Sequence, residues 1–379
     1  MNTVVAQAPG RINLIGEHTD YNQGYAMPIA LEERTTVRFE PDGSDTVRLT
    51  SEQDGVDAAF ALPVRPGEVD GWAAYPAGVL WALAAAGHRV VGGTIRVTSD
   101  VPIGAGLSSS AALECAVLLA MNAAAGTELE LLEVARIAQR GENDFVGAPT
   151  GLMDQLASLH GAVDRALLID FDDLSVQPVV FDLELNGLRL LVINSNAAHH
   201  HSSGEYASRR ESCARVALAL GVESLRQVQG VDGVLDRIDD EVDRRRARHI
   251  LGENQRVLDC AEALGASDFR RVGELMNQSH ASMRDDFEIT TPHIDLIADS
   301  AVRHGALGAR MTGGGFGGCV IALVPEGELG RIGEAIEADI AEGGFPAPTL
   351  FVARAGQGAS IVSVGATFVG DGGDPRILR

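Results

Sequence analysis

Four side chains that can hold a polar ligand lie close together near the start of the chain. The run from Gly10 to Asn22, GRINLIGEHTDYN, contains Arg11, Glu17, His18 and Asp20 within ten positions. Together they offer hydrogen-bond donors and acceptors, the combination needed to bind a polyhydroxylated molecule. Glycines within and around the run allow the backbone to bend around such a ligand. We therefore interpret this loop-like run as part of a ligand site; the alternative is a solvated turn that carries its charges by chance.

A second run, Asp100 to Leu113 (DVPIGAGLSSSAAL), has the pattern of a phosphate-binding loop. A strand is expected to end here, Gly104 and Gly106 allow a tight turn, and a helix is expected to begin at the serines. The amides at a helix N-terminus lack intrahelical partners, and the helix dipole favours an anion there. A helix that is simply capped by serine is the alternative, but the three consecutive serines, Ser108 to Ser110, exceed what capping needs.

The chain contains no lysine, so all 30 of its lysine-plus-arginine residues are arginine. This excludes the P-loop pattern GxxxxGK[ST] and the lysine of the protein-kinase VAIK motif. It also excludes Schiff-base chemistry through lysine. Any phosphate bound here must therefore be held by backbone amides, hydroxyl groups, arginine or a metal ion.

Four motifs of this chain resemble those of galactokinases, which belong to the GHMP kinase family. The first run with its flanks, Ala8 to Leu31, is similar to the galactokinase signature almost residue for residue. Asp100 to Leu113 resembles the second GHMP motif, and GLMDQ at residues 151–155 resembles the galactokinase sequence GIMDQ. The glycine-rich run Arg310 to Val320 (RMTGGGFGGCV) resembles the third GHMP motif.

The third motif also contains a GxGxxG pattern, at Gly313, Gly315 and Gly318. The dinucleotide-binding fingerprint of this form requires a helix after the glycines, whereas an apolar, β-branched strand is expected here. A nucleotide-dependent oxidoreductase is therefore excluded, and a bare structural bend is the remaining alternative. Segments at 246–257 and 282–297 also resemble galactokinases, so that the resemblance extends over residues 8 to 370.

The resemblance implies a role for each matched residue. Asp154 would accept the proton of the sugar's anomeric hydroxyl, and Arg11 would lie between Asp154 and the transferred phosphoryl group, so that both are catalytic. Mg²⁺ would be held by Ser110 and Glu142. The residues implied to bind the sugar are Glu17, His18, Asp20, Gly151, Asp154 and Tyr206. The residues implied to bind ATP are Gly104, Gly106, Leu107, Ser108, Ser109, Ser110 and Ala111.

Taken by themselves, two of these residues allow other interpretations. Glu142 stands near a predicted helix end, where a glutamate is usually solvated. Asp154, between apolar neighbours, is either a helix cap or a partly desolvated functional carboxylate. An adjacent arginine favours an ionised carboxylate and weakens it as a base, and the transition state of phosphoryl transfer is loose. Asp154 would therefore act either as a true base or by positioning the attacking hydroxyl.

Three places depart from the family pattern or suggest other chemistry. Thr150 stands where most galactokinases carry cysteine, and we expect a small effect. The triplet GEY at 204–206 replaces the family's SEY, in which the tyrosine, here Tyr206, contacts the sugar. The histidines at 199–201 suggest a metal, but three in a row cannot share one face of a strand or helix. A solvated loop is expected there instead.

The hydrophobic pattern predicts a mixture of strands and helices. Helices are expected over residues 109–124, 129–143, 205–220, 243–264 and 292–304. Strands are expected over residues 3–8, 94–98, 188–194, 318–324, 351–353 and 360–364. The resemblance implies an α+β, two-domain GHMP-kinase fold. It has an N-terminal α/β domain over residues 1–178, a C-terminal α+β, ferredoxin-like domain over residues 179–379, and the active site between them.

Length and composition limit the number of domains, the cellular location and the kinds of partner that we expect. The 379 residues, 45% of them apolar, suffice for two domains with hydrophobic cores. No apolar run is long enough to cross a membrane, and the N-terminus lacks the features of a signal peptide, so we expect a cytoplasmic protein. The net charge of −23 argues against a nucleic-acid partner. Seven residues precede Ala8, fewer than in most galactokinases. The scattered cysteines are expected to be buried, without disulfides or metal: Cys115, Cys213, Cys260 and Cys319.

The resemblance implies ATP-dependent phosphorylation of galactose at its anomeric hydroxyl, giving α-D-galactose 1-phosphate and ADP, the first step of galactose catabolism (the Leloir pathway). Galactose, ATP and Mg²⁺ are then its partners, and we expect a monomer or a weak homo-oligomer. Two alternatives stay open: a GHMP kinase for a related sugar such as N-acetylgalactosamine or galacturonate, and a galactose and ATP sensor without turnover. A sensor could lose Asp154 or Arg11, and this chain keeps both.

Overall fold

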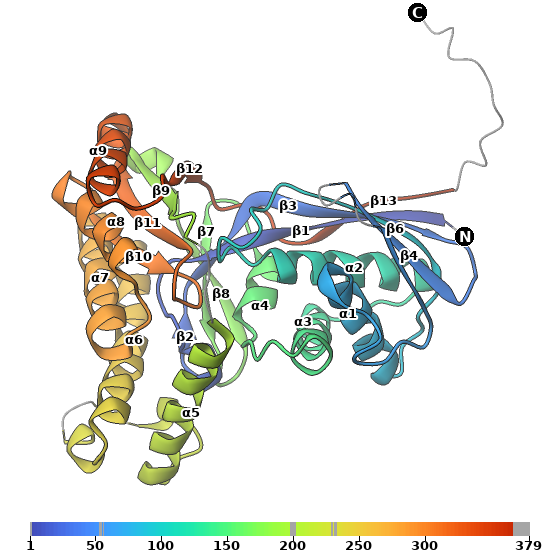
Figure 1. The fold of residues 1–379 in the computed structure, drawn as a ribbon, viewed down its shortest axis with the longest axis horizontal. Helices are drawn as coiled ribbons and strands as arrows, with labels where there is room; N and C mark the ends of the chain where they lie inside the picture. Colours follow the sequence, from blue (N-terminus) through green and yellow to red (C-terminus); the bar gives the residue numbers. More distant parts are fainter. Residues whose placement is uncertain are drawn as a thin grey trace, which may run out of the picture.

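The computed structural model describes residues 2–52, 55, 57–197, 202–228, 230 and 233–366. Within these residues the chain forms two large sheets, each with helices packed against it, and a small sheet between them (Figure 1). This mixture of strands and helices is the α+β class that the sequence predicted.

The first large sheet has six strands in the order β13-β1-β3-β6-β4-β5. β4 and β6 run parallel, whereas the other neighbours are antiparallel. Along β4 and residues 35–41 of β3 buried residues alternate with more exposed ones, so that one face of the sheet carries most of the apolar side chains there. The six strands are β1 (Asn2–Asn13), β3 (Pro28–Pro41), β4 (Thr46–Ser51), β5 (Asp57–Ala61), β6 (Gly93–Ser99) and β13 (Ser360–Ala366).

Four helices cover one face of this sheet (Figure 1). They are α1 (Ala74–Ala85), α2 (Ser109–Ala125), α3 (Leu131–Arg140) and α4 (Met153–His160). α2 packs against β1 and β3 on one side and against α1, α3 and α4 on the other. A helix enclosed in this way needs apolar or small residues around most of its circumference, which explains its run of alanines and leucines. The surrounding contacts fix the first turn of α2, where phosphate was predicted to bind.

The second large sheet has four antiparallel strands in the order β10-β11-β9-β12. They are β9 (Leu188–Asn194), β10 (Gly308–Thr312), β11 (Cys319–Pro325) and β12 (Thr349–Ala353). Successive side chains of β9 and β11 join two different hydrophobic clusters, one on each face of the sheet. The helices of this half are α5 (Ser202–Leu220), α6 (Glu241–Gly265), α7 (Phe269–Ser282), α8 (Pro292–Arg303) and α9 (Leu329–Glu342).

The two halves are linked by more than one crossing of the chain. A small sheet of β2 (Tyr25–Ala26), β7 (Arg165–Asp170) and β8 (Ser175–Val180) lies between the large sheets (Figure 1). The division predicted at residue 178 falls inside β8. β13 returns to the first half and pairs with β1, for example Val364 with Val4. The last described strand therefore forms the edge of the first sheet, next to the first strand.

Most predicted elements are present. The strand expected over 188–194 is β9, and the helices expected in the regions of α2, α5, α6 and α8 end within three residues of their predicted limits. The four cysteines are buried and none is in a disulfide, as predicted. The histidines at 199–201 lie outside the described residues. Among the helices that the structure describes, none is both long and apolar enough to span a membrane.

Two local predictions were wrong. The run from Gly10 to Asn22 is not a loop throughout, because β1 continues to Asn13, and Arg11 therefore lies on a strand paired with Ala30 of β3. The α-helix predicted over 129–143 ends at Arg140, and a π-helical turn, Gly141–Val146, follows it directly. A π-helical turn changes the direction of its side chains relative to a regular helix and is frequent at functional sites.

Candidate active site

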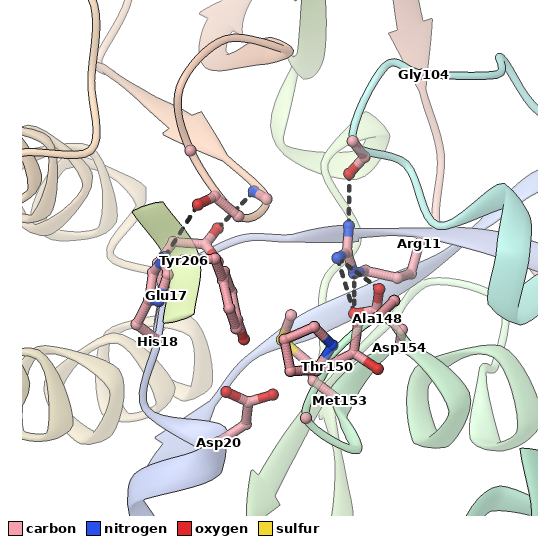
Figure 2. A pocket seen from close by; sticks show the side chains of 16 residues that line it. Arg11, Glu17, His18, Asp20, Gly104, Ala148, Thr150, Met153, Asp154 and Tyr206 are labelled. Atoms are coloured by element: carbon pink, nitrogen blue, oxygen red, sulfur yellow. Dashed lines mark hydrogen bonds and ion pairs between the residues drawn. The ribbon is translucent and has the colours of Figure 1, made fainter. Parts of the chain in front are cut away.

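A cavity of about 450 Å³ lies where β1, the loop before α2, the start of α4 and the loop after β10 meet (Figure 2). Glycines of the second and third motifs, such as Gly106 and Gly313, form part of its wall. The cavity brings together all of the predicted catalytic and sugar-binding residues: Arg11, Glu17, His18, Asp20, Gly151, Asp154 and Tyr206. Segments from both halves of the chain therefore build one site.

Arg11 and Asp154 form a paired contact at the wall of this cavity. The Nε and Nη2 atoms of Arg11 donate to the two carboxylate oxygens of Asp154 over 2.8 and 2.9 Å. Nη1 donates to the carbonyl of Gly106 over 2.6 Å, and the hydroxyl of Ser108 also donates to Asp154. Such a bidentate, charge-assisted contact fixes both position and orientation. Asp154 is not a helix cap, since Leu152 is the N-cap residue of α4. The side chain of Asp154 is 22% exposed, so that it is only partly desolvated.

The loop before α2 presents a helix N-terminus that no side chain caps. Ser108 is the N-cap residue, in the left-handed region with a φ of 58°, and its hydroxyl binds Asp154 instead of an amide of the helix. Gly104 and Gly106 also have positive φ values, 71° and 74°, which glycine adopts without strain. The carbonyl of Leu107 accepts the amide of Arg11 over 3.0 Å and so fixes the loop to β1. The first amides of α2 are available to an anion, and the serine-capped alternative is wrong.

Glu142 lies inside the protein, not on its surface as its position near a helix end suggested. It is only 4% exposed. Its Oε2 atom accepts hydrogen bonds of 2.9 Å from the hydroxyl of Thr150 and from the amide of Gln155. Burial and the charge of Asp154 raise the pKa of Glu142, while hydrogen bonds from Thr150, Ser110 and Gln155 act in the opposite direction. The hydroxyl of Ser110, in the first turn of α2, and this carboxylate are thus neighbours.

Asp20 and Tyr206 lie across the cavity from Arg11 and Asp154 (Figure 2). Burial raises the pKa of Asp20 to about 6, with smaller contributions from Asp154 and Glu17. The Asp20 carboxylate packs directly against Gly151: a Cβ atom added there would lie 1.6 Å from Oδ2. Any larger residue at this position of the GLMDQ motif would therefore displace the Asp20 carboxylate.

His18 is held in a fixed, neutral form. Burial and the neighbouring His249 lower its pKa to about 3. Its Nε2 lies 3.1 Å from the carbonyl of Gly314, which can only accept, so Nε2 carries the proton. Nδ1 then accepts the hydroxyl proton of Tyr21 over 2.8 Å. The ring also packs against Tyr206 with 4.8 Å between centroids, so that His18 joins the first motif, the third motif and α5.

Glu17 links the first and third motifs at the wall of the cavity. One of its oxygens, Oε1, accepts the amide of Gly313 over 2.9 Å and lies 3.6 Å from the guanidinium of Arg310. Burial raises the pKa of Glu17, whereas Arg310 and Arg11 oppose that change. β11 follows the glycines of the third motif as predicted, which confirms the argument against a dinucleotide-binding fingerprint.

Behind Glu17, a second buried carboxylate completes a charge cluster. Glu253 of α6 is fully buried and accepts hydrogen bonds from Arg256 over 2.7 Å, Ser279 over 2.6 Å and the amide of Gly16 over 3.0 Å. Arg310 lies 3.8 Å from it. Burial alone would raise the pKa of Glu253, but Arg256, His249 and Arg310 hold it at about 2.

Several residues of this site were not predicted from the sequence. Arg310 stands within the third motif, and Glu253 lies in the segment 246–257 that resembles galactokinases. Their positions in these segments could have drawn attention to both residues, but the sequence does not show what either of them contacts. The contacts of Thr150 and Gln155 with Glu142 depend on the π-helical turn, which the pattern of apolar and polar residues does not predict. Tyr21 lies within the first motif, and its bond to His18 follows only from the fold.

Models of known families match three parts of the chain. The galactokinase galactose-binding signature matches residues 1–41, the N-terminal domain of GHMP kinases matches residues 74–162, and the C-terminal part of GHMP kinases matches residues 260–341. The range 1–41 contains the first sequence motif, and the range 74–162 contains the second motif and the start of α4. The range 260–341 contains the third motif.

Galactokinases of other organisms match nearly the whole chain. A galactokinase of Mycobacterium tuberculosis (strain H37Rv) is 55% identical over 94% of this chain and 99% of its own length, and one of Streptomyces coelicolor is 45% identical over 93% and 92%. Lactococcus lactis galactokinase in complex with galactose superposes with a TM-score of 0.88 and 34% identity, over 94% of this chain and 95% of that one. Mevalonate kinase of Methanococcus jannaschii, at 20% identity and a TM-score of 0.66, shares the fold. The two-domain GHMP-kinase fold is thereby confirmed.

Replacing Glu253 by glutamine is expected to destabilise the fold by about 3–5 kcal/mol, because Arg256 and Arg310 would lose a buried counter-charge. Urea denaturation monitored by circular dichroism measures the change. As the pKa of Glu253 is depressed to about 2, its stabilising contribution is present above the ordinary glutamate pKa and is lost as the pH falls toward 2.

The matched control is Glu274→Gln, which removes a half-exposed carboxylate of α7 whose partners, Arg270 and Arg271, are also exposed. This variant is expected to change the free energy of unfolding by less than about 0.5 kcal/mol. Equal effects of the two substitutions would contradict the importance of the buried cluster.

Proposed function

Because the chain belongs to the galactokinases of the GHMP kinase family and has their activity, the ATP-dependent phosphorylation of galactose, we propose that transfer occurs to the anomeric hydroxyl. The products would be α-D-galactose 1-phosphate and ADP, at the first step of galactose catabolism. The observation that carries this proposal is the Arg11–Asp154 contact, which lies between the helix N-terminus of the phosphate loop and the polar residues of the sugar side.

In this proposal Asp154 binds the attacking hydroxyl and receives its proton. The oxygen of that hydroxyl attacks the γ-phosphorus of ATP, the bond to the β-γ bridging oxygen breaks, and ADP leaves. Because the transition state is loose, deprotonation is not needed early, and orientation of the hydroxyl by a fixed carboxylate contributes directly. Arg11 holds that carboxylate and places positive charge beside the transferred group.

The sugar side of the cavity supplies acceptors and a shaped wall. The solved Lactococcus lactis relative is described as complexed with galactose, and we propose that galactose occupies the corresponding cavity here. Asp20 and Tyr206 face it, Gly151 allows close approach, and Glu17 and His18 also line it, on the side of Tyr206. A site that pairs each hydroxyl with a buried polar group discriminates strongly against sugars lacking one. No observation favours N-acetylgalactosamine, galacturonate or a sensor role.

ATP would bind with its phosphates at the N-terminus of α2. Gly104, Gly106 and Leu107 shape the loop, and the amides that follow Ser108 point outward without a side-chain cap. The remaining residues assigned to phosphate binding are Ser109, Ser110 and Ala111. Since the chain has no lysine, backbone amides and the helix dipole carry this recognition.

The donor set beside this helix fits a magnesium ion. Glu142 offers a buried carboxylate and Ser110 a neighbouring hydroxyl. Mg²⁺ prefers oxygen ligands and usually keeps waters and substrate phosphates in its shell, with one or two protein groups. We therefore assign Ser110 and Glu142 to hold Mg²⁺, which would neutralise charge on the phosphates when bound.

Asp154→Asn tests the catalytic assignment. The variant keeps the size of the side chain but removes its ability to take a proton, so kcat is expected to fall by about 10²–10⁴ while galactose binding stays within a few-fold. A coupled ADP-release assay measures turnover, and isothermal titration measures galactose binding. The control is Asp172→Asn at an exposed position, which should be fully active; full activity of Asp154→Asn would remove this residue from its role.

The raised pKa of Asp20, about 6, predicts a pH dependence. A protonated Asp20 cannot accept two hydroxyl donors, so kcat/KM for galactose is expected to fall about tenfold per pH unit below pH 6 and to level off above pH 7. Initial rates at low galactose between pH 5 and 8 measure this. Asp20→Asn should lower kcat/KM at pH 8 and abolish the acid limb; a wild-type profile that stays flat down to pH 5 would contradict the assignment.

A further inference from the structure

Two neutral donors hold one oxygen of Glu142. The hydroxyl of Thr150 and the amide of Gln155 both lie 2.9 Å from Oε2. Both donors belong to the segment around the GLMDQ motif, whereas Glu142 lies on the π-helical turn that follows α3. Because two donors from different directions meet the same oxygen, the carboxylate cannot rotate freely, and its other oxygen points in a fixed direction.

The backbone of Thr150 is itself fixed by Asn143, the neighbour of Glu142. The amide of Thr150 donates to Oδ1 of Asn143 over 3.0 Å, and Nδ2 of Asn143 donates to the carbonyl of Thr150 over 3.2 Å. The Thr150 hydroxyl also lies 3.1 Å from that Oδ1. Oδ1 already accepts an amide, and a hydrogen bond to a carboxylate is stronger than one to a neutral oxygen, so the hydroxyl proton goes to Glu142.

Gln155 is anchored from the opposite side by α2. Its side chain is fully buried, and Nε2 lies 3.3 Å from Oε2 of Glu114. Glu114 is also fully buried and follows Ser110 by four residues on α2, so both lie on the same face of that helix. The chain of contacts therefore runs from the α2 face that carries Ser110, through Glu114 and Gln155, to Glu142.

From this geometry we infer that Thr150 and Gln155 are positioning residues, which set the direction of the Glu142 carboxylate toward Ser110 and the metal. The inference rests on the proposed Mg²⁺ site. It also revises the expectation that threonine in place of cysteine at this position has a small effect: the hydroxyl is a stronger donor than a thiol, and here that donor is used. Partners of this kind typically change metal affinity by about 10–100-fold when removed.

The decisive comparison is Thr150→Val against Thr150→Ser. Valine keeps the shape of threonine without the hydroxyl, whereas serine keeps the hydroxyl. In the full-length enzyme with ADP, Mn²⁺ binding measured by electron paramagnetic resonance is expected to weaken about tenfold in Thr150→Val and to stay near wild type in Thr150→Ser. The KM for galactose should change little. Gln155→Met, which removes the other donor, should also weaken Mn²⁺ binding.

The control is Thr127→Val, two residues after the end of α2, where the hydroxyl donates to the carbonyl of Asn122; its Mn²⁺ affinity should equal that of the wild type. Thr150→Ala replaces Thr150→Val if the latter does not fold. Wild-type Mn²⁺ affinity in the variants lacking the Thr150 hydroxyl would overturn the inference.

Glu142→Gln separates this inference from the metal assignment beneath it. If Glu142→Gln loses Mn²⁺ binding while Thr150→Val and Gln155→Met do not, the positioning role is wrong and the metal site stands. If Glu142→Gln binds Mn²⁺ as tightly as the wild type, the metal assignment itself is wrong.

Discussion

The buried charge cluster behind the cavity is the interaction on which the rest of the site depends. Arg310 is fully buried and lies between the carboxylates of Glu17 and Glu253. Burying three charges costs several kcal/mol per ion unless each has close partners. Here hydrogen bonds from Gly16 and Gly313 to the two carboxylates provide them. The charged groups and the amides that bind them come from the first motif, α6 and the third motif. The charges therefore have their partners only when all three segments are in place.

The Arg11–Asp154 contact performs a similar task on the other side of the cavity. Arg11 stands on β1, Asp154 in the first turn of α4, and the carbonyl of Gly106 in the phosphate loop. One planar guanidinium binds a carboxylate with two nitrogens and a backbone carbonyl with the third. The three donors of a lysine ammonium all sit on one nitrogen, so lysine lacks the planar fork that pairs with both carboxylate oxygens and reaches a carbonyl on another side. The residue assigned to catalysis is therefore also the residue that joins the phosphate loop to the sugar side.

Sequence reasoning located the parts of the site that lie in motifs and missed the parts that depend on long-range packing. Asp20, Asp154 and Tyr206 were assigned from their motifs, and the structure places all three at one cavity. Ser108 was assigned to phosphate binding, and the motif does not show that its hydroxyl binds Asp154, 46 residues away. Helical pattern could not show that Glu142 is buried, because its burial follows from a π-helical turn and from Thr150 and Gln155, which the pattern does not place beside it. The charges of Arg310 and Glu253 were visible, but their pairing depends on the approach of β10 to α6.

The balance of charge in the cavity explains how a site rich in acids can accept a triphosphate. Burial raises the pKa values of Glu17, Asp20 and Glu142, which means that the site bears its negative charge at a cost in free energy. Arg11 is already bound to Asp154 and Gly106, and no lysine exists to add positive charge. The amides of α2 supply only partial charge. In the proposed site, a divalent cation at Glu142 and Ser110 would relieve the carboxylate and receive the phosphates, and the direction in which Glu142 is held would then contribute to ATP binding.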